Sequence, residues 1–150
     1  MRWLLTRRQL LRHLDRGRLE RAIAAAERAT SGEIRISVAP FFWGDVQRAA
    51  ERAFQRLGMR GTEERNGVLL FVVPSRRRLA VLGDEGIHQR VGQQFWEELV
   101  KQLTERFRTG SFTEGLEQAV QHLGEQLARH FPHAGAADRN ELHDDVDLGP

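Results

Sequence analysis

The chain has 150 residues, which suits one domain that buries about 70% of its unfolded surface without disulfides or structural metals. It contains no cysteine, so disulfides, thiolate metal sites and cysteine nucleophiles are excluded. Its 23 Lys and Arg residues nearly balance 21 Asp and Glu residues, and the net charge of +2 is not typical of nucleic-acid-binding domains. The phosphate-cradling motif Gly-x-x-x-x-Gly-Lys-Ser/Thr is absent. We therefore expect neither a nucleic-acid partner nor a nucleotide.

Residues 1–14, MRWLLTRRQLLRHL, are expected to form an amphipathic N-terminal segment. Such a helix either lies on a membrane surface or packs on the core of its own domain, and packing on the core is the commoner outcome. Its longest uncharged run is far shorter than a signal-peptide core or a membrane span, so we expect no transmembrane segment. The expected location is cytoplasmic. Peripheral attachment to a membrane surface is compatible with this expectation.

Three elements are predicted in the first part of the main domain. Asp15 is a suitable N-cap for a helix that runs to about Thr30. Apolar and polar residues alternate over 33–39, which predicts a strand with one buried face. Asp45 then caps a helix with apolar residues at helical spacing over 46–57.

The stretch GVLLFVV (67–73) is apolar throughout, as expected for a central strand that is covered on both faces. The connection from strand 33–39 contains a helix, so these two strands should be parallel. The short turn PSRR allows only an antiparallel partner at 78–83. Residues 62–67 and 83–88 should therefore lie at the same rim of the sheet.

Two more helices are predicted, over 92–108 and from Ser111 to about His130, the second with a capping box formed by Ser111 and Glu114. The aromatic link PFFWGD (40–45) either covers the sheet or accepts a partner. The acidic tail, 132–150, is either a draped extension or a disordered end. The fold class is thus α/β, a three-layer α-β-α sandwich with a small mixed β-sheet and its main domain over 15–131.

The predicted rim gathers oxygen-bearing side chains beside glycines, which is the type of loop-built cage that Ca²⁺ or Mg²⁺ requires. Asn66 and Asp84 would be the inner ligands, and Glu85 with backbone carbonyls would complete the shell. In the alternative interpretation, GDEG is a tight turn in which Asp84 caps a helix that starts near Gly86.

Three segments, SGEIRISV, RNGVLLFVVPSRRRLAVLGDEGIH and FRTGSFTEGLEQAVQHLG, together resemble the TPM domain over residues 15–131. This family includes thylakoid-lumen acid phosphatases, photosystem-repair factors and bacterial envelope proteins, and the tail RNELHDDV resembles its short or membrane-attached bacterial members. The resemblance implies an α-β-α sandwich, divalent cations in loops at the sheet rim and, in some members, phosphomonoester hydrolysis. It places Asn66 and Asp84 at metal-loop positions, whereas Arg65 departs from the family pattern Asp-Asn-Gly.

Two functions are consistent with these observations. The first is a divalent-cation-binding protein-interaction module in membrane-protein maintenance or envelope stress, with a membrane-associated protein partner. The alternative is a metal-assisted acid phosphatase in which a metal-bound water attacks a phosphomonoester. Arg65, which would steady the phosphate, and His88, which would act as acid or base, are then the candidate catalytic residues.

Overall fold

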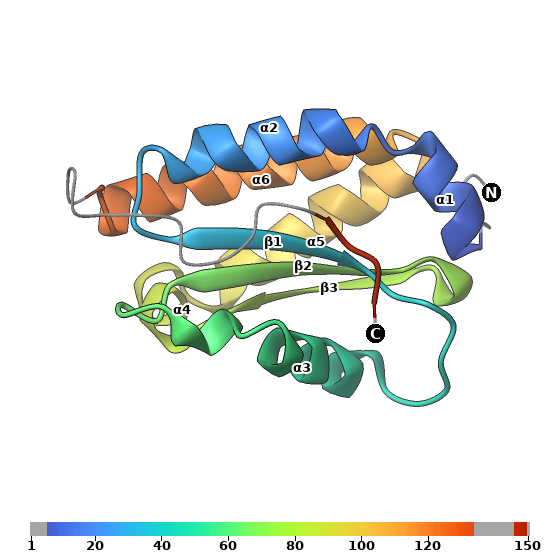
Figure 1. Cartoon of the computed structure of the whole chain (residues 1–150), viewed down its shortest axis with the longest axis horizontal. Coiled ribbons are helices and arrows are strands. Elements are labelled where there is room, and N and C mark those ends of the chain that lie inside the picture. Colours follow the sequence, from blue (N-terminus) through green and yellow to red (C-terminus); the bar gives the residue numbers. More distant parts are fainter. Residues whose placement is uncertain (1–5, 134–145, 150) are drawn as a thin grey trace.

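A computed structural model of the chain describes residues 6–133 and 146–149 (Figure 1). Its strands are β1 (Glu33–Val38), β2 (Gly67–Val73), β3 (Arg78–Gly83) and β4 (Val146–Asp147). Its helices are α1 (Arg7–His13), α2 (Arg16–Glu27), α3 (Val46–Arg56), α4 (Glu85–Val91), α5 (Gln93–Arg108) and α6 (Phe112–His130). Short 3-10 turns, η1 (Met59–Gly61) and η2 (Pro74–Arg76), flank β2.

The strands form one mixed sheet in the order β3-β2-β1-β4. β1 and β2 are parallel, because the crossover between them contains α3, and β2 and β3 are antiparallel across the short η2 turn. Both predicted pairings are confirmed. Val68 lies opposite Gly83, so the residues that precede β2 and follow β3 share one rim of the sheet.

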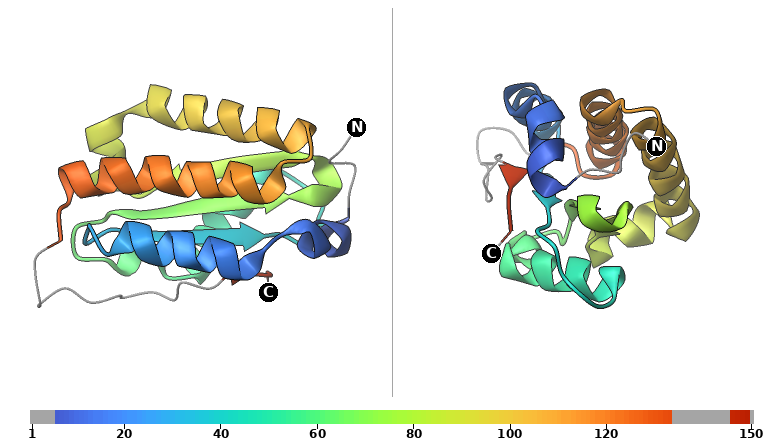
Figure 2. Two further views of the ribbon diagram at one scale, coloured as in Figure 1. Left: turned by 90° about the horizontal axis from the view of Figure 1, so that it is seen from above. Right: turned by 90° about the vertical axis from the view of Figure 1, so that its right-hand side faces the viewer.

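Helices cover both faces of the sheet (Figures 1 and 2). α2, α5 and α6 lie on one face, and α3 lies on the other. This arrangement confirms the predicted α-β-α sandwich.

β2 divides the hydrophobic core between the two faces. Its even-numbered residues from Val68 to Val72 join the larger cluster with α2, α5 and α6, and its odd-numbered residues from Leu69 to Val73 pack with α3. Side chains alternate across a strand, so only an unbroken apolar run can fill both layers. Each large side chain buried in this way contributes roughly 1.5–3 kcal/mol.

The prediction that β1 has only one buried face is wrong. Ser37 is fully buried and Arg35 is 8% exposed, although both lie on the predicted polar face. The Ser37 hydroxyl donates to Asp147 Oδ2 at 2.8 Å, and the Arg56 guanidinium donates to the same oxygen at 2.9 Å. The face is therefore closed by α3 and by β4, and β4 is 110 residues away in sequence from Ser37.

β4 pairs in parallel with β1 and buries Val146 in the main cluster. Of the two alternatives for the tail, residues 146–149 therefore follow the draped one. Residues 134–145 lie outside the described part of the chain.

The N-caps predicted at Asp15 and Asp45 both make the expected hydrogen bond. Asp15 Oδ1 accepts from the Arg18 amide at 3.0 Å, and Asp45 Oδ1 accepts from the Gln47 amide at 3.2 Å. Gly58 follows α3 with φ +69°, a conformation that costs glycine little. These local signals were sufficient to place the starts of α2 and α3.

The predicted capping box at the start of α6 is wrong. Ser111 makes no side-chain cap bond, and its hydroxyl lies 3.3 Å from the hydroxyl of Thr109. Glu114 instead forms an ion pair with Arg18 of α2, so tertiary contacts outweigh the local motif. A complete capping box occurs at the start of α1, between Thr6 and Gln9, and the spacing Thr-x-x-Gln could have revealed it.

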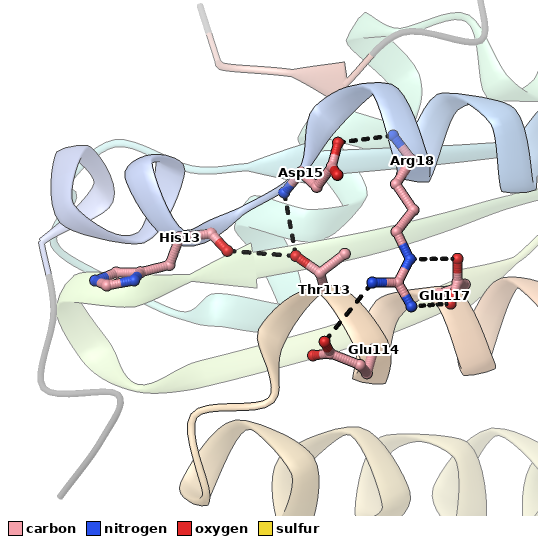
Figure 3. A network of polar contacts seen from close by, with 6 residues as sticks. All are labelled: His13, Asp15, Arg18, Thr113, Glu114 and Glu117. Carbon is pink, nitrogen blue, oxygen red and sulfur yellow. Dashed lines mark hydrogen bonds and ion pairs between the residues drawn. The ribbon is translucent and has the colours of Figure 1, made fainter.

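A polar network fastens the link between α1 and α2 to the start of α6 (Figure 3). The Thr113 hydroxyl accepts from the Asp15 amide at 3.1 Å and donates to the His13 carbonyl at 3.3 Å. Arg18 donates two hydrogen bonds to the Glu117 carboxylate, at 2.8 and 2.7 Å. These contacts fix α1 at one end of the sandwich.

The N-terminal segment contributes to the core where it is described. Leu10 and Leu14 of this segment are buried in the main cluster, whereas Trp3, Leu4 and Leu5 lie outside the described residues. Within residues 6–133 and 146–149, no helix combines the length and the apolar character that crossing a bilayer requires.

Candidate functional site

The predicted rim is built around an ion pair between Arg65 and Asp84. Arg65 Nε lies 2.6 Å from Asp84 Oδ2, and Arg65 Nη2 lies 2.8 Å from Asp84 Oδ1. The Asp84 side chain is only 4% exposed, which strengthens a bidentate pair of this kind. The hydrogen bonds to Asp84 and the negative charge of Asp84 raise the pKa of the Arg65 guanidinium, which is thus a permanent cation.

The same carboxylate caps α4. Asp84 Oδ1 accepts from the Glu85 amide at 2.8 Å, which is the alternative role that the sequence offered for Asp84. A Cβ at Gly86 would lie 2.1 Å from the Glu64 carbonyl oxygen, and the Gly86 amide donates to the Arg65 carbonyl at 2.8 Å. The first turn of α4 therefore sits directly on the loop that precedes β2.

Asn66 is directed toward Ser31 rather than toward Asp84. Its amide Nδ2 donates to the Ser31 hydroxyl at 3.0 Å, and that hydroxyl donates to Glu64 Oε1 at 2.9 Å. Asn66 is 1% exposed, and its Oδ1 accepts no hydrogen bond within the described residues. A buried oxygen of this kind costs about 1–3 kcal/mol, so this atom is a potential contact for a ligand.

The rim as a whole does not fit a Ca²⁺ or Mg²⁺ ion in this arrangement. Such ions need six or more oxygens, mostly from carboxylates, carbonyls and water. Both Asp84 oxygens face the guanidinium of Arg65, and Glu85 is exposed. In the described ranges, His, Asp and Glu nowhere form a group of three that could hold a metal ion. Asn66, Asp84 and Glu85 remain predicted ligands, and a cation would have to displace Arg65.

His88 lies on α4 and is held by a core tryptophan. The Trp96 indole Nε1–H donates to His88 Nδ1 at 2.9 Å. A neutral imidazole with Nδ1 as acceptor carries its proton on Nε2. In this tautomer His88 can donate a hydrogen bond to a bound molecule, but it accepts a proton only by releasing Trp96.

A groove beside β3 was not anticipated from the sequence. It has a volume of about 520 Å³ and lies between α3 and α5. The residues that line it are Gln47, Leu79, Ala80, Val81, Leu82, Gly83, His88, Gln93, Trp96, Glu97 and Val100. All five consecutive residues from Leu79 to Gly83 contact the groove, although their side chains alternate between the two faces. The groove therefore runs along the backbone edge of the strand.

This edge presents unpaired backbone groups. The Asp84 amide donates to the Gly67 carbonyl at 2.9 Å, so these two residues form a hydrogen-bonded antiparallel pair. Such pairs alternate along the ladder, which directs the N–H and C=O groups of Leu79, Val81 and Gly83 away from β2 and into the groove. β3 is an edge strand within the described sheet, so no other strand there receives them.

Gly83 allows a tryptophan to form the wall of the groove. A Cβ at this position would lie 2.2 Å from a ring carbon of Trp96, so only glycine lets the indole lie across the end of β3. The sequence contained a signal for the groove, because the short PSRR turn fixes β3 beside β2 and no strand follows it directly. The missing information was that α3 and α5 leave the edge uncovered.

Comparisons with known proteins agree with this architecture. The family model of the TPM domain matches residues 5–126. The NMR structure of the BA42 protein from the psychrophilic bacterium Bizionia argentinensis is 32% identical, with a TM-score of 0.81 over 89% of this chain and 92% of that one. The NMR structure of the N-terminal domain of a P. gingivalis protein is 20% identical, with a TM-score of 0.61 over 78% of this chain and 75% of that one, and shows the fold alone.

No significant match is found among curated protein sequences. The family model covers most of the chain, including both segments that form the rim and the strand that borders the groove. The chain belongs to the TPM domain family.

Proposed function

We propose that this TPM domain is a non-catalytic protein-interaction module in membrane-protein maintenance or envelope stress, and that the groove beside β3 receives an extended segment of its partner. The observation that carries this proposal is the free backbone edge from Leu79 to Gly83. Unpaired N–H and C=O groups on an edge strand are complementary to another extended chain.

The walls of the groove favour a single strand over a second sheet. α3 and α5 both contact β3 and flank its edge, so a broad partner would collide with one of them. A lone segment would place alternate side chains toward Gln47 on one side and toward Trp96 and Val100 on the other. Backbone hydrogen bonds would then supply affinity, and the two walls would supply selectivity.

The rim gives less support to catalysis. Arg65 is committed to Asp84, and His88 is committed to Trp96, so both candidate catalytic residues already have partners. Divalent-cation binding by this domain stays part of the proposal, and it requires that the cation compete with Arg65 for the carboxylate of Asp84. The role in membrane-protein maintenance is supported by membership of the TPM family.

The test uses a phage-displayed library of random peptides and the purified chain. We expect selected peptides to protect the amides of Leu79, Val81 and Gly83 from hydrogen exchange, because these amides point into the groove. Val81→Pro should weaken binding about tenfold or more, since it removes one donor and leaves a peptide carbonyl unpaired. The measurements are amide exchange by NMR and peptide affinity by calorimetry.

Val81→Ala is the matched control. It loses the same side-chain packing as the proline variant but keeps the backbone donor, so its peptide affinity should stay near that of the wild type. Equal binding by wild type and Val81→Pro, or failure to select any peptide, would refute the groove as the binding site.

The competing proposal is the metal-assisted acid phosphatase. It requires a free acid or base and an anion-binding cation at the rim, and Asn66 Oδ1 is the one feature there that invites a ligand. Hydrolysis of p-nitrophenyl phosphate with magnesium or calcium, abolished by chelator and by Asp84→Asn, would favour this function over the interaction module. We expect no activity above the uncatalysed rate.

A further inference from the structure

The end of the sandwich opposite the Asp84 rim carries an exposed aromatic pair. Phe41 is 58% exposed and Trp43 is 85% exposed, and these are the exposed large hydrophobic side chains of the described residues. Their rings meet edge to face, with centroids 4.9 Å apart. Phe42 lies between them in sequence and turns inward toward the ring of Phe71, at 6.5 Å. The link from β1 to α3 thus uses one aromatic residue for the core and leaves two outside.

Segments that contain arginine lie at the same end of the sandwich as this pair. α1, the β1–α3 link and the turn between β2 and β3 all lie at this end, and they face the viewer together in Figure 2. Segments 7–13, 40–45 and 74–78 contain six arginines and one acid, Asp45, whose carboxylate caps α3. We refer to these three segments as the basic aromatic end.

The segments are fastened to one another. The Arg76 guanidinium donates to the Gly44 carbonyl and lies 5.6 Å from the ring centroid of Phe42. α1 also contacts the η2 turn. Arg76 therefore fastens the aromatic link to the η2 turn, and α1 lies against the same turn.

We propose that the basic aromatic end docks on a membrane surface that contains anionic lipid. Trp43 and Phe41 enter the boundary between headgroups and acyl chains, where amphipathic aromatic side chains are enriched. The arginines lie at the level of the lipid phosphates and supply charge complementarity. This surface is separate from the groove and does not depend on the function proposed for it.

Arginines beside aromatic rings also occur on proteins that bind single-stranded nucleic acid. There, successive bases stack on flat ring faces. Trp43 and Phe41 instead contact each other at 87°, which forms a compact wedge rather than a pair of parallel platforms. The geometry therefore favours the lipid surface.

Docking through this end would orient the whole domain. The strands run from the basic aromatic end to the Asp84 rim, so the rim would face the aqueous phase and the groove would extend away from the membrane. A partner segment next to the bilayer could then enter the groove along its length.

The experiment is co-sedimentation of the full chain with vesicles of phosphatidylcholine, with and without phosphatidylglycerol. We expect binding to the anionic vesicles alone, with weakening at high salt. Trp43→Ala should reduce binding about tenfold or more, because it removes a large apolar group from the inserted surface. Arg8→Glu, an exposed position on α1, should reduce binding roughly tenfold or more.

Arg60→Glu is the matched control, because Arg60 is exposed near Asp84 at the other end and undergoes the same change of charge. It should bind like the wild type, and circular dichroism should show all variants folded. The proposal is overturned if anionic vesicles do not bind, if Trp43→Ala binds as well as the wild type, or if Arg60→Glu binds as poorly as Arg8→Glu. In a competition experiment, a single-stranded oligonucleotide and added free lipid would each displace the protein from the vesicles at some concentration. If the oligonucleotide acts at the lower concentration, the surface is assigned to nucleic acid instead.

Discussion

The guanidinium of Arg65 makes two short hydrogen bonds to the nearly buried carboxylate of Asp84. Its backbone has φ +53°, a conformation that costs a non-glycine residue roughly 1–2 kcal/mol. The ion pair with Asp84 offsets this cost, because it neutralises a carboxylate that is nearly buried. Arg65 thus supplies the positive charge that balances Asp84 at the rim.

Removing this arginine should reveal a latent response to calcium. Arg65→Asn tolerates the left-handed backbone, and it leaves Asp84 with only its cap hydrogen bond. We expect the free energy of unfolding to fall, because the nearly buried carboxylate of Asp84 loses its ion pair with Arg65. Saturating calcium should restore part of this loss, whereas the wild type should change little. Thermal unfolding with and without calcium measures both effects.

The double variant Arg65→Asn, Asp84→Asn is the control for this prediction. Asn caps a helix about as well as Asp, so the double variant keeps the start of α4 but has no carboxylate to offer. An equal calcium response in the single and double variants, or a full response in the wild type, would contradict the role assigned to Arg65.

At the scale of elements, β4 closes the sheet edge beside β1 through Asp147. Burial raises the pKa of Asp147, but hydrogen bonds from Arg56 and Ser37 and the charge of Arg56 outweigh this effect, so its pKa lies below the ordinary value. A carboxyl group with a depressed pKa in the folded state stabilises the fold above the unfolded-state value of about 3.9. That contribution is lost as the pH falls through the lower, folded value.

Asp147→Asn should therefore lower the free energy of unfolding by about 1 kcal/mol at neutral pH, since Arg56 is partly exposed. The difference from the wild type should shrink as the pH falls below about 4. Urea unfolding at several pH values checks this. Asp45→Asn serves as the control, because Asp45 caps α3 and Asn is an equivalent cap there. A difference that does not vary with pH would show that Asp147 acts by packing alone.

Most helices and strands were predictable because each is marked by its own residues. Asp15 and Asp45 cap helices at their first turns, and the apolar run after Asn66 could only be a central strand. β4 was not predictable, since two residues show no periodicity and the partner strand is far away in sequence. The capping box predicted for Ser111 and Glu114 was wrong because of another contact between residues distant in sequence. Arg18 of α2 forms an ion pair with Glu114.

At the scale of the molecule, the architecture follows from two local rules, while the site does not. A helix-bearing crossover and a tight turn fix the order of β1, β2 and β3, and hence bring Arg65, Asn66 and Asp84 to one rim. The contacts within the rim depend on rotamers, on the left-handed backbone of Arg65 and on the close approach of Gly86. The groove depends on how far two helices stand apart, which no short sequence pattern encodes.

The hydrogen bond between Trp96 and His88 has a consequence for spectroscopy. Of the three tryptophans in the chain, Trp96 lines the groove, Trp43 lies at the basic aromatic end and Trp3 precedes the described residues. The indole of Trp96 is buried and already bonded, while that of Trp43 is in water. Their emission should differ in wavelength, and each should shift only when its own surroundings change. Trp43 and Trp96 are therefore natural reporters of two different surfaces, and phenylalanine substitutions can separate their emission from each other and from that of Trp3 without any attached dye.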